Sequence, residues 1–292
     1  MKNTNRRSED ASKNLMEKPS PREVFAEGKR LVNFPASDAD YKSGFALIKK
    51  ASLLGEIFAH EWLGAIYDYG LGVRRNGQLA FKHYRIAAEA GQPNSEYHVG
   101  VFYKVGVGVR PNRRLAIKWF ERAAAHGDAG ALHGLGWCYR FGDGVPRNLT
   151  KGFRLHLRAA RKGIVEAQFS VAVCLSRGEG VTPNARKAFK WCLAAARRGH
   201  PDAAHNLGFF YKTGRGVRKS KIKSEFWYKR AEMLQQSTRA AYKPVRRSPK
   251  QRERRVVDQA ITNYYDGLSA KVRSELTKWG NFSLAQTKNE IE

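Results

Sequence analysis

Residues 59–73 read AHEWLGAIYDYGLGV, and the same pattern returns four more times at a constant interval of 36 residues. The later copies are SEYHVGVFYKVGVGV at 95–109, ALHGLGWCYRFGDGV at 131–145, AQFSVAVCLSRGEGV at 167–181 and AAHNLGFFYKTGRGV at 203–217. Five copies in register are too many for coincidence, so the chain is predicted to be an array of one repeated structural unit.

Each unit is predicted to hold two antiparallel helices. In the first helix, Ala59, Leu63 and Ile66 fall on one face at helical spacing. The GxGV sequence then ends this helix, because glycine tolerates the left-handed conformation of a helix C-cap. A residue with a favourable N-cap side chain precedes the second helix in every copy. These predicted N-caps are Asn76, Asn112, Asn148, Asn184 and Ser220.

Glycine also recurs in the middle of the first helix, where it costs about 1 kcal/mol relative to alanine. We expect helices to cross closely at these positions, since no side chain separates their backbones. The positions are Gly64, Gly100, Gly136 and Gly208.

The pattern A-x3-L-G-x2-Y-x2-G-x-G-V, followed by a helix with an aromatic residue, paired alanines and a closing glycine, resembles the Sel-1-like repeat family. This family is related to the tetratricopeptide repeat, and the resemblance covers about residues 56–234. It implies an all-α fold, a right-handed α-solenoid with a concave and a convex surface. Stability would be spread over contacts between neighbouring repeats. The resemblance also implies a scaffold or adaptor.

Five regular repeats are predicted at 56–235, between less regular segments. Residues 1–20 are expected to be a disordered polar tail, and 21–55 a degenerate repeat that caps the N-terminal end. A basic linker is predicted at 236–255. In 256–292 the apolar residues again follow a helical period, which predicts a helical cap on the last repeat. A separate pair of docking helices is the alternative.

No pattern in the sequence indicates catalysis, so no catalytic residue and no cofactor are predicted. The glycine strings follow no predicted strand and lack the GK[ST] ending of a phosphate-binding loop. Cys138, Cys174 and Cys192 fall in columns of core residues, so we expect them to be buried. Cysteine-rich relatives linked to β-lactamase activity or penicillin binding carry a disulfide in each repeat, which this chain lacks. His133 and His205 lie two repeats apart, too far to share a metal ion.

The composition is that of a globular but strongly basic protein, with 42% hydrophobic residues and a formal net charge of +28. Residues 101–250 hold most of this excess, with 32 Lys and Arg against 8 Asp and Glu. No run of about 18 apolar residues exists, so no membrane span is expected. The polar N-terminus favours neither a secretory signal nor a transit peptide. Three scattered cysteines favour a reducing, cytoplasmic location.

One face of the first helices is predicted to form a partner-binding groove. Its columns combine aromatic, apolar and cationic side chains along the helices that line the concave surface in the family. Such a surface suits an extended or helical peptide that carries acidic residues. Simple packing between adjacent first helices is the alternative. The predicted groove residues are Tyr97, Val101, Lys104, His133, Trp137, Arg140, Phe169, His205, Phe209 and Lys212.

The second helices are predicted to carry an anion-binding face. Cations in their first turns oppose the helix dipole, at about 0.3–1 kcal/mol each, which is understandable if they hold an anion. The predicted residues are Arg113, Arg114, Lys118, Arg122, Arg154, Arg158, Arg161, Arg186, Lys190 and Arg197. An acidic protein, a nucleic acid and lipid phosphates all remain open as ligands, beside a basic surface without a ligand. The leading hypothesis is a protein-binding scaffold, and nonspecific nucleic-acid or polyanion binding is the alternative.

Overall fold

The computed structural model describes residues 19–35 and 37–242, which form twelve α-helices joined by short connections, without a strand. The helices are α1 (Pro21–Asn33), α2 (Asp38–Leu53), α3 (Ile57–Tyr69), α4 (Gly77–Glu89), α5 (Pro93–Val105), α6 (Arg113–Ala125), α7 (Ala129–Phe141), α8 (Leu149–Arg161), α9 (Val165–Arg177), α10 (Ala185–Arg197), α11 (Pro201–Thr213) and α12 (Lys221–Tyr242). Each of the five sequence repeats corresponds to one helix pair, from α3–α4 to α11–α12. The predicted all-α solenoid is confirmed.

Both predicted caps are present in every repeat. The first helix ends at a glycine with φ between +73° and +87°, a left-handed conformation that would strain any other residue. These C-caps are Gly70, Gly106, Gly142, Gly178 and Gly214. The asparagine N-caps of α4, α6, α8 and α10 accept a hydrogen bond from the backbone N–H three residues later at 2.9–3.0 Å. Ser220 does the same for α12 at 3.3 Å.

The glycines inside the first helices lie against a ring of the second helix, as expected for close crossing. A Cβ atom on any of them would lie 2.6–2.7 Å from that ring, which is too close for the packing to tolerate. The pairs are Gly64 with Tyr84, Gly100 with Phe120, Gly136 with His156 and Gly208 with Tyr228. At the equivalent positions of the fourth repeat stand Ala172 and Cys192, both buried. A glycine on the first helix therefore faces a large ring on the second, and the larger alanine of the fourth repeat faces the smaller cysteine.

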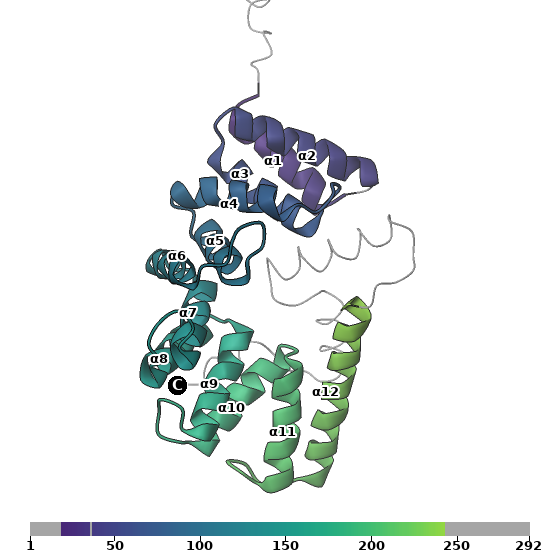
Figure 1. Cartoon of the computed structure of the whole chain (residues 1–292). Coiled ribbons are helices and arrows are strands. Elements are labelled where there is room, and N and C mark those ends of the chain that lie inside the picture. Colours follow the sequence, from purple (N-terminus) through teal and green to yellow (C-terminus); the bar gives the residue numbers. More distant parts are fainter. Residues whose placement is uncertain (1–18, 36, 243–292) are drawn as a thin grey trace, which may run out of the picture.

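The helix pairs follow one another along an arc, with α6 and α8 on its outer side and α5 and α7 on its inner side (Figure 1). The main contacts of each helix are with the helix before it and the helix after it. Buried residues form three clusters, over α1–α3, α4–α5 and α6–α12. The described chain therefore has no single central core, as expected for a solenoid.

The structure alters one predicted boundary. The linker predicted at 236–255 begins inside α12, which continues to Tyr242. The sequence QQSTRAAY at 235–242 contains neither glycine nor proline and is rich in residues that favour a helix, so the helix has no local reason to stop. Upstream, the segment predicted as a degenerate repeat contains α1 and α2. Residues 1–18 of the predicted tail and the whole predicted cap at 256–292 lie outside the described residues.

Candidate functional site

Exposed apolar side chains lie at equivalent or neighbouring positions of three first helices, α5, α7 and α11. Trp137, Phe141 and Phe209 are between 41% and 54% exposed, and Val105 is more exposed still. The Trp137 and Phe141 rings stack at a centroid distance of 4.5 Å, because residues four apart share a helix face. We call these four residues the inner stripe. Trp137 and Phe209 were predicted from the sequence as groove residues, whereas Phe141 and Val105 were not, although each lies one helical turn after a predicted groove position.

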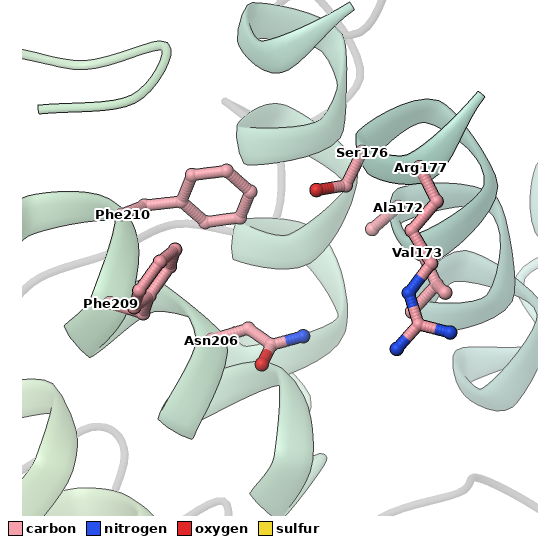
Figure 2. A pocket seen from close by; sticks show the side chains of 7 residues that line it. All are labelled: Ala172, Val173, Ser176, Arg177, Asn206, Phe209 and Phe210. Carbon is pink, nitrogen blue, oxygen red and sulfur yellow. The ribbon is translucent and has the colours of Figure 1, made fainter. Parts of the chain in front are cut away.

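A small cleft of about 170 Å³ opens at one end of the inner stripe, between α9 and α11. Figure 2 shows Asn206 and Phe209 of α11 facing Val173 and Arg177 of α9 across it. Ala172, Ser176 and Phe210 complete the lining. The cleft therefore combines an aromatic wall with an amide and a guanidinium, groups that can bind an apolar side chain and a carboxylate. Of its lining residues, only Phe209 was predicted from the sequence to belong to the groove.

Three predicted groove residues mainly fill the space between helices. Tyr97 packs with its ring 5.8 Å from that of Phe120, and Phe169 lies 4.4 Å from the ring of His200. His133 Nδ1 lies 3.1 Å from Nδ1 of His156 on the paired helix. Burial lowers the pKa of His133 to about 4 and raises the pKa of Tyr97, so both stay neutral near pH 7. At these three positions, the alternative of simple packing between helices describes the structure better than a role in a partner-binding groove.

Arg140 was predicted to present its charge to the groove, but in the structure its side chain is buried. It is only 9% exposed, and its Nε donates to Oε2 of Glu179 at 2.7 Å. Its guanidinium also lies over the Phe141 ring, 5.1 Å from the centroid. The sequence pattern could not show this, because the acid comes from the GxGV turn of the following repeat.

The other predicted groove positions remain closer to the surface. Nζ of Lys104 lies 3.9 Å from Oδ2 of Asp143, a loose ion pair. Lys212 is exposed, and no carboxylate of residues 19–35 or 37–242 lies within ion-pair distance of it. Val101 is half-buried, and the exposed His205 meets the Tyr228 ring edge to face at 5.0 Å. Of the predicted cations, Lys104 and Lys212 can therefore face a bound partner.

The cations of the second helices are exposed, apart from the half-buried Arg197. Some of them already meet carboxylates of the chain. Arg113 forms an ion pair with Asp143, and Nε of Arg122 lies 2.5 Å from the buried Glu96. The other predicted side chains, Arg114, Lys118, Arg154, Arg158, Arg161, Arg186 and Lys190, lie on the exposed face of α6, α8 and α10. The second helices therefore present a basic surface, on which the charges of Arg113 and Arg122 are partly balanced by carboxylates of the chain.

The cysteines occupy the core, as predicted. Cys138, Cys174 and Cys192 are buried and not in disulfides. Burial raises the pKa of all three thiols, that of Cys192 to about 12, so the nucleophilic thiolate is disfavoured. Within the described ranges no three His, Cys, Asp or Glu side chains are placed to hold a metal ion. None of the helices described here is both long and apolar enough to cross a membrane.

Solved structures similar to this chain include repeat proteins. A Sel1 repeat protein from Oxalobacter formigenes is 29% identical, with a TM-score of 0.69, over 78% of this chain and 94% of that one. The protective antigen c5321 of uropathogenic Escherichia coli, which has an SLR fold, is 21% identical with a TM-score of 0.68. The match to c5321 covers 97% of this chain but 65% of the antigen.

A more distant match is the immunity protein PA5088 from Pseudomonas aeruginosa, 20% identical with a TM-score of 0.51, over 83% of this chain and 94% of that one. At this level of identity the likeness concerns the fold. Among proteins with curated descriptions, none matches this chain significantly. The family model described as Sel1 repeat matches five consecutive segments, 57–92, 93–128, 129–164, 165–200 and 201–235. These segments coincide with the five helix pairs, and the chain belongs to the Sel1 repeat family.

Proposed function

We propose that this protein is a non-enzymatic scaffold that binds an extended segment of a partner protein along the inner stripe. The observation that carries the proposal is the set of exposed rings of Trp137 and Phe141 on α7 and of Phe209 on α11. Exposed apolar surface of this kind marks interaction sites, and aromatic side chains at the centre of an interface supply much of the binding energy. The Sel1 repeat fold, typical of protein-interaction scaffolds, supports the same function.

The flanking charges favour an acidic partner. Lys104, Arg177 and Lys212 lie beside the stripe, one on each of α5, α9 and α11. Asp143 and Glu179 are close to Lys104 and Arg177, so part of their charge is balanced within the chain. Lys212 has the least local compensation and borders the part of the face that holds the cleft. A carboxylate next to an apolar side chain would therefore bind best near Phe209, between Lys212 and Arg177.

A peptide-display selection on the purified protein tests this function. We expect enrichment of peptides with an aromatic or large aliphatic residue flanked by Asp or Glu. The double substitution Trp137→Ala with Phe209→Ala should weaken their binding by about tenfold or more, measured by calorimetry, since it removes two aromatic anchors. Phe58→Ala is the matched control, because Phe58 is similarly exposed but lies on α3, a helix that carries no residue of the stripe.

Binding that survives the double substitution, or that is lost equally in Phe58→Ala, would contradict the assignment to the stripe. Selection of basic or purely polar peptides would contradict the proposed acidity of the partner. The isolated variants should keep the helical signal of the wild type, because both substituted rings are substantially exposed.

A second candidate function is nonspecific binding of nucleic acid or another polyanion by the second helices. It is favoured by the exposed side chains of Lys118, Arg154 and Lys190, one per repeat at equivalent positions. A regular row of cations matches a regular row of phosphates, and such binding weakens steeply with salt. Against a duplex, the slope of log K on log salt would be about −0.9 per phosphate contacted.

A salt titration against labelled duplex and single-stranded oligonucleotides distinguishes the two functions. Charge reversal at Lys118, Arg154 and Lys190 should lower nucleic-acid affinity and the salt slope together, and should leave peptide binding to the inner stripe unchanged. Absence of binding near physiological salt would remove nucleic acid as the ligand of this face.

A further inference from the structure

The outer face of α12 differs from that of the second helices before it. At three positions of this face α12 carries Ile222, Phe226 and Met233, which are 81%, 46% and 55% exposed. The equivalent positions of α4, α6, α8 and α10 are Gln78, Arg114, Thr150 and Arg186, then Lys82, Lys118, Arg154 and Lys190, then Glu89, Ala125, Arg161 and Arg197. An apolar side chain thus replaces a polar, charged or small one at each position, and only in the last repeat.

The three residues form one continuous stripe along α12. Phe226 follows Ile222 by four residues, and Met233 follows Phe226 by seven. At 3.6 residues per turn, the three side chains therefore lie within about 40° of one another around the helix axis. Lys229 is exposed and falls between Phe226 and Met233 on the same side. We call Ile222, Phe226, Lys229 and Met233 the α12 stripe. Large apolar groups in such a row are normally covered, because their exposure to water is unfavourable.

A sixth repeat stacked in register would not cover this stripe. Stacking uses another face, on which Phe81 packs against the rings of Phe102 and Tyr103 of the next helix pair. In α12 the equivalent residue is Glu225, and Glu232 stands where the earlier helices have alanine. Both glutamates are exposed, and burying them under another repeat would be costly. The array therefore ends at α12, and whatever covers the stripe lies beside the helix.

We propose that residues 256–268 of this chain fold back along α12 and cover the α12 stripe. The chain leaves α12 at Tyr242, with residues 243–292 still to follow. In 256–268, VVDQAITNYYDGL, the residues Val257, Ile261, Tyr264 and Leu268 recur at helical spacing. A helix with such an apolar face is a partner of the shape and chemistry that the stripe requires.

The connection is long enough for this return. Phe226 lies about 24 Å before Tyr242 along the helix axis, at 1.5 Å per residue. The intervening residues 243–255 can span about 40 Å when extended, so the segment reaches the stripe with slack. A tether of this length also keeps the segment at a high effective concentration near α12, which favours it over a separate partner.

The charges are complementary as well. Residues 256–268 contain Asp258 and Asp266 and no Lys or Arg, in a protein whose net charge is +28. The stripe contains Lys229, and Lys223 lies one turn from Phe226 on the same helix. This acidic, apolar segment is therefore attracted to the surface, whereas a basic stretch of the chain would be repelled by its lysines.

Hydrogen exchange on the full-length protein tests the proposal. We expect amides in 256–268 to be protected, and to lose about tenfold or more of that protection in the double variant Ile222→Arg with Phe226→Lys. This variant gives α12 the residues that α10 carries at the same positions, Arg186 and Lys190, so the helix itself should remain folded. Protection in α3–α11 serves as the internal measure of folding.

Substitution of Arg114→Gln with Lys118→Ala is the matched control, since it changes the same positions of α6 and should leave 256–268 protected. Sedimentation identifies competing occupants. A dimer that the double variant dissociates would overturn the proposal and make the stripe an interface between two copies. A monomer whose residues 256–268 exchange freely in the wild type, or stay protected in the double variant, would overturn it as well.

Discussion

At the scale of single residues, the contact between Gly100 and Phe120 shows what allows the two helices of a repeat to approach each other closely. A Cβ atom on Gly100 would lie 2.6 Å from the Phe120 ring and 3.2 Å from the backbone carbonyl oxygen of Ala116. Neither neighbour can move freely, because the ring is buried and the carbonyl belongs to α6. In the fourth repeat the first helix carries the larger alanine here, and the second helix carries a cysteine, which is smaller than an aromatic ring. Local volume, rather than helix propensity, therefore selects glycine here.

Gly100→Ala is expected to lower the free energy of unfolding by about 1–3 kcal/mol, although alanine is the better helix former. Urea denaturation followed by circular dichroism measures the change. Ala172→Gly, at the equivalent position opposite Cys192, is the comparison and should lose about 1 kcal/mol from helix propensity. A Gly100→Ala variant as stable as the wild type would show that the Phe120 ring can move away.

Buried histidines give the protein an acid-sensitive core. Burial, the largest cause, lowers the pKa of His156 to about 3 and of its neighbour His133 to about 4. Nearby positive charge on Arg140 acts in the same direction on His156. Both rings are neutral in the folded protein near pH 7, while in the unfolded chain they take up protons near pH 6.5. The fold is therefore fully stable above that pH and loses stability as the pH falls.

Between about pH 6.5 and pH 4, each such histidine should remove up to about 1.4 kcal/mol of stability per pH unit. His156→Phe places in α8 the residue type that α6 carries at Phe120, so it should fold and should reduce this loss. Urea midpoints of both proteins at pH 7.5 and pH 5.0 provide the measurement. An equal loss in wild type and variant would exclude His156 as a source of the acid sensitivity.

At the scale of the element, the second helices α6, α8 and α10 begin with a strong cap and with cations that are unfavourable there. Asn112 accepts a hydrogen bond from the N–H of Leu115 at 3.0 Å, while Arg113 and Arg114 occupy the first turn of α6. No acidic residue stands in the first turn of α4, α6, α8 or α10. The cap therefore stabilises a helix start at which the cations oppose the dipole.

Asn112→Ala should destabilise the protein by about 1 kcal/mol, because the N–H of Leu115 loses its acceptor. Asn112→Asp keeps that acceptor and adds a negative charge at the N-terminus of α6, so it should match or exceed the wild type by up to about 1 kcal/mol. Thermal denaturation at low and high salt measures both effects. The advantage of aspartate should shrink as salt increases, and an advantage independent of salt would contradict an electrostatic origin.

At the scale of the whole molecule, polar contacts at one recurring place link the second, third, fourth and fifth repeats, while Val107 stands at this place between the first and second. The residue between the two glycines of the GxGV turn reaches back to the first helix of the preceding repeat. Asp143 meets Lys104, Glu179 meets Arg140, and Arg215 donates to the carbonyl oxygen of Ser176 at 2.8 Å. Each pair is 39 residues apart, one repeat plus three positions. The contacts hold neighbouring repeats in register in a solenoid that lacks a central core.

Glu179→Gln is expected to lower the free energy of unfolding by about 1–3 kcal/mol, since it leaves the buried guanidinium of Arg140 without its carboxylate. Asp143→Asn is the matched change one repeat earlier and should lose less, because its partner Arg113 is largely exposed. Urea denaturation of the two variants gives the comparison. The reverse order of stability would mean that burial of Arg140 does not govern this junction.

Much of the fold was predictable from the sequence, because its causes are local and repeated five times. Glycine at the C-cap, asparagine at the N-cap and apolar spacing of one helical turn each act within a few residues. The site was predictable only in part. Trp137 and Phe209 were identified from their column, but Arg140 was misassigned, since its partner Glu179 comes from another repeat.

The sequence by itself determined the repeat, its two helices, their caps and the crossing glycines, since each depends on residues near one another in the chain. Only the tertiary structure decided which side of each column remains exposed. It buried Arg140, engaged Arg113 and Arg122 in ion pairs, and opened the cleft beside Phe209. It also exposed Ile222, Phe226 and Met233 at the last helix. Exposure depends on what the neighbouring repeat places opposite a residue, and that placement is set by packing across a distance of 36 residues or more.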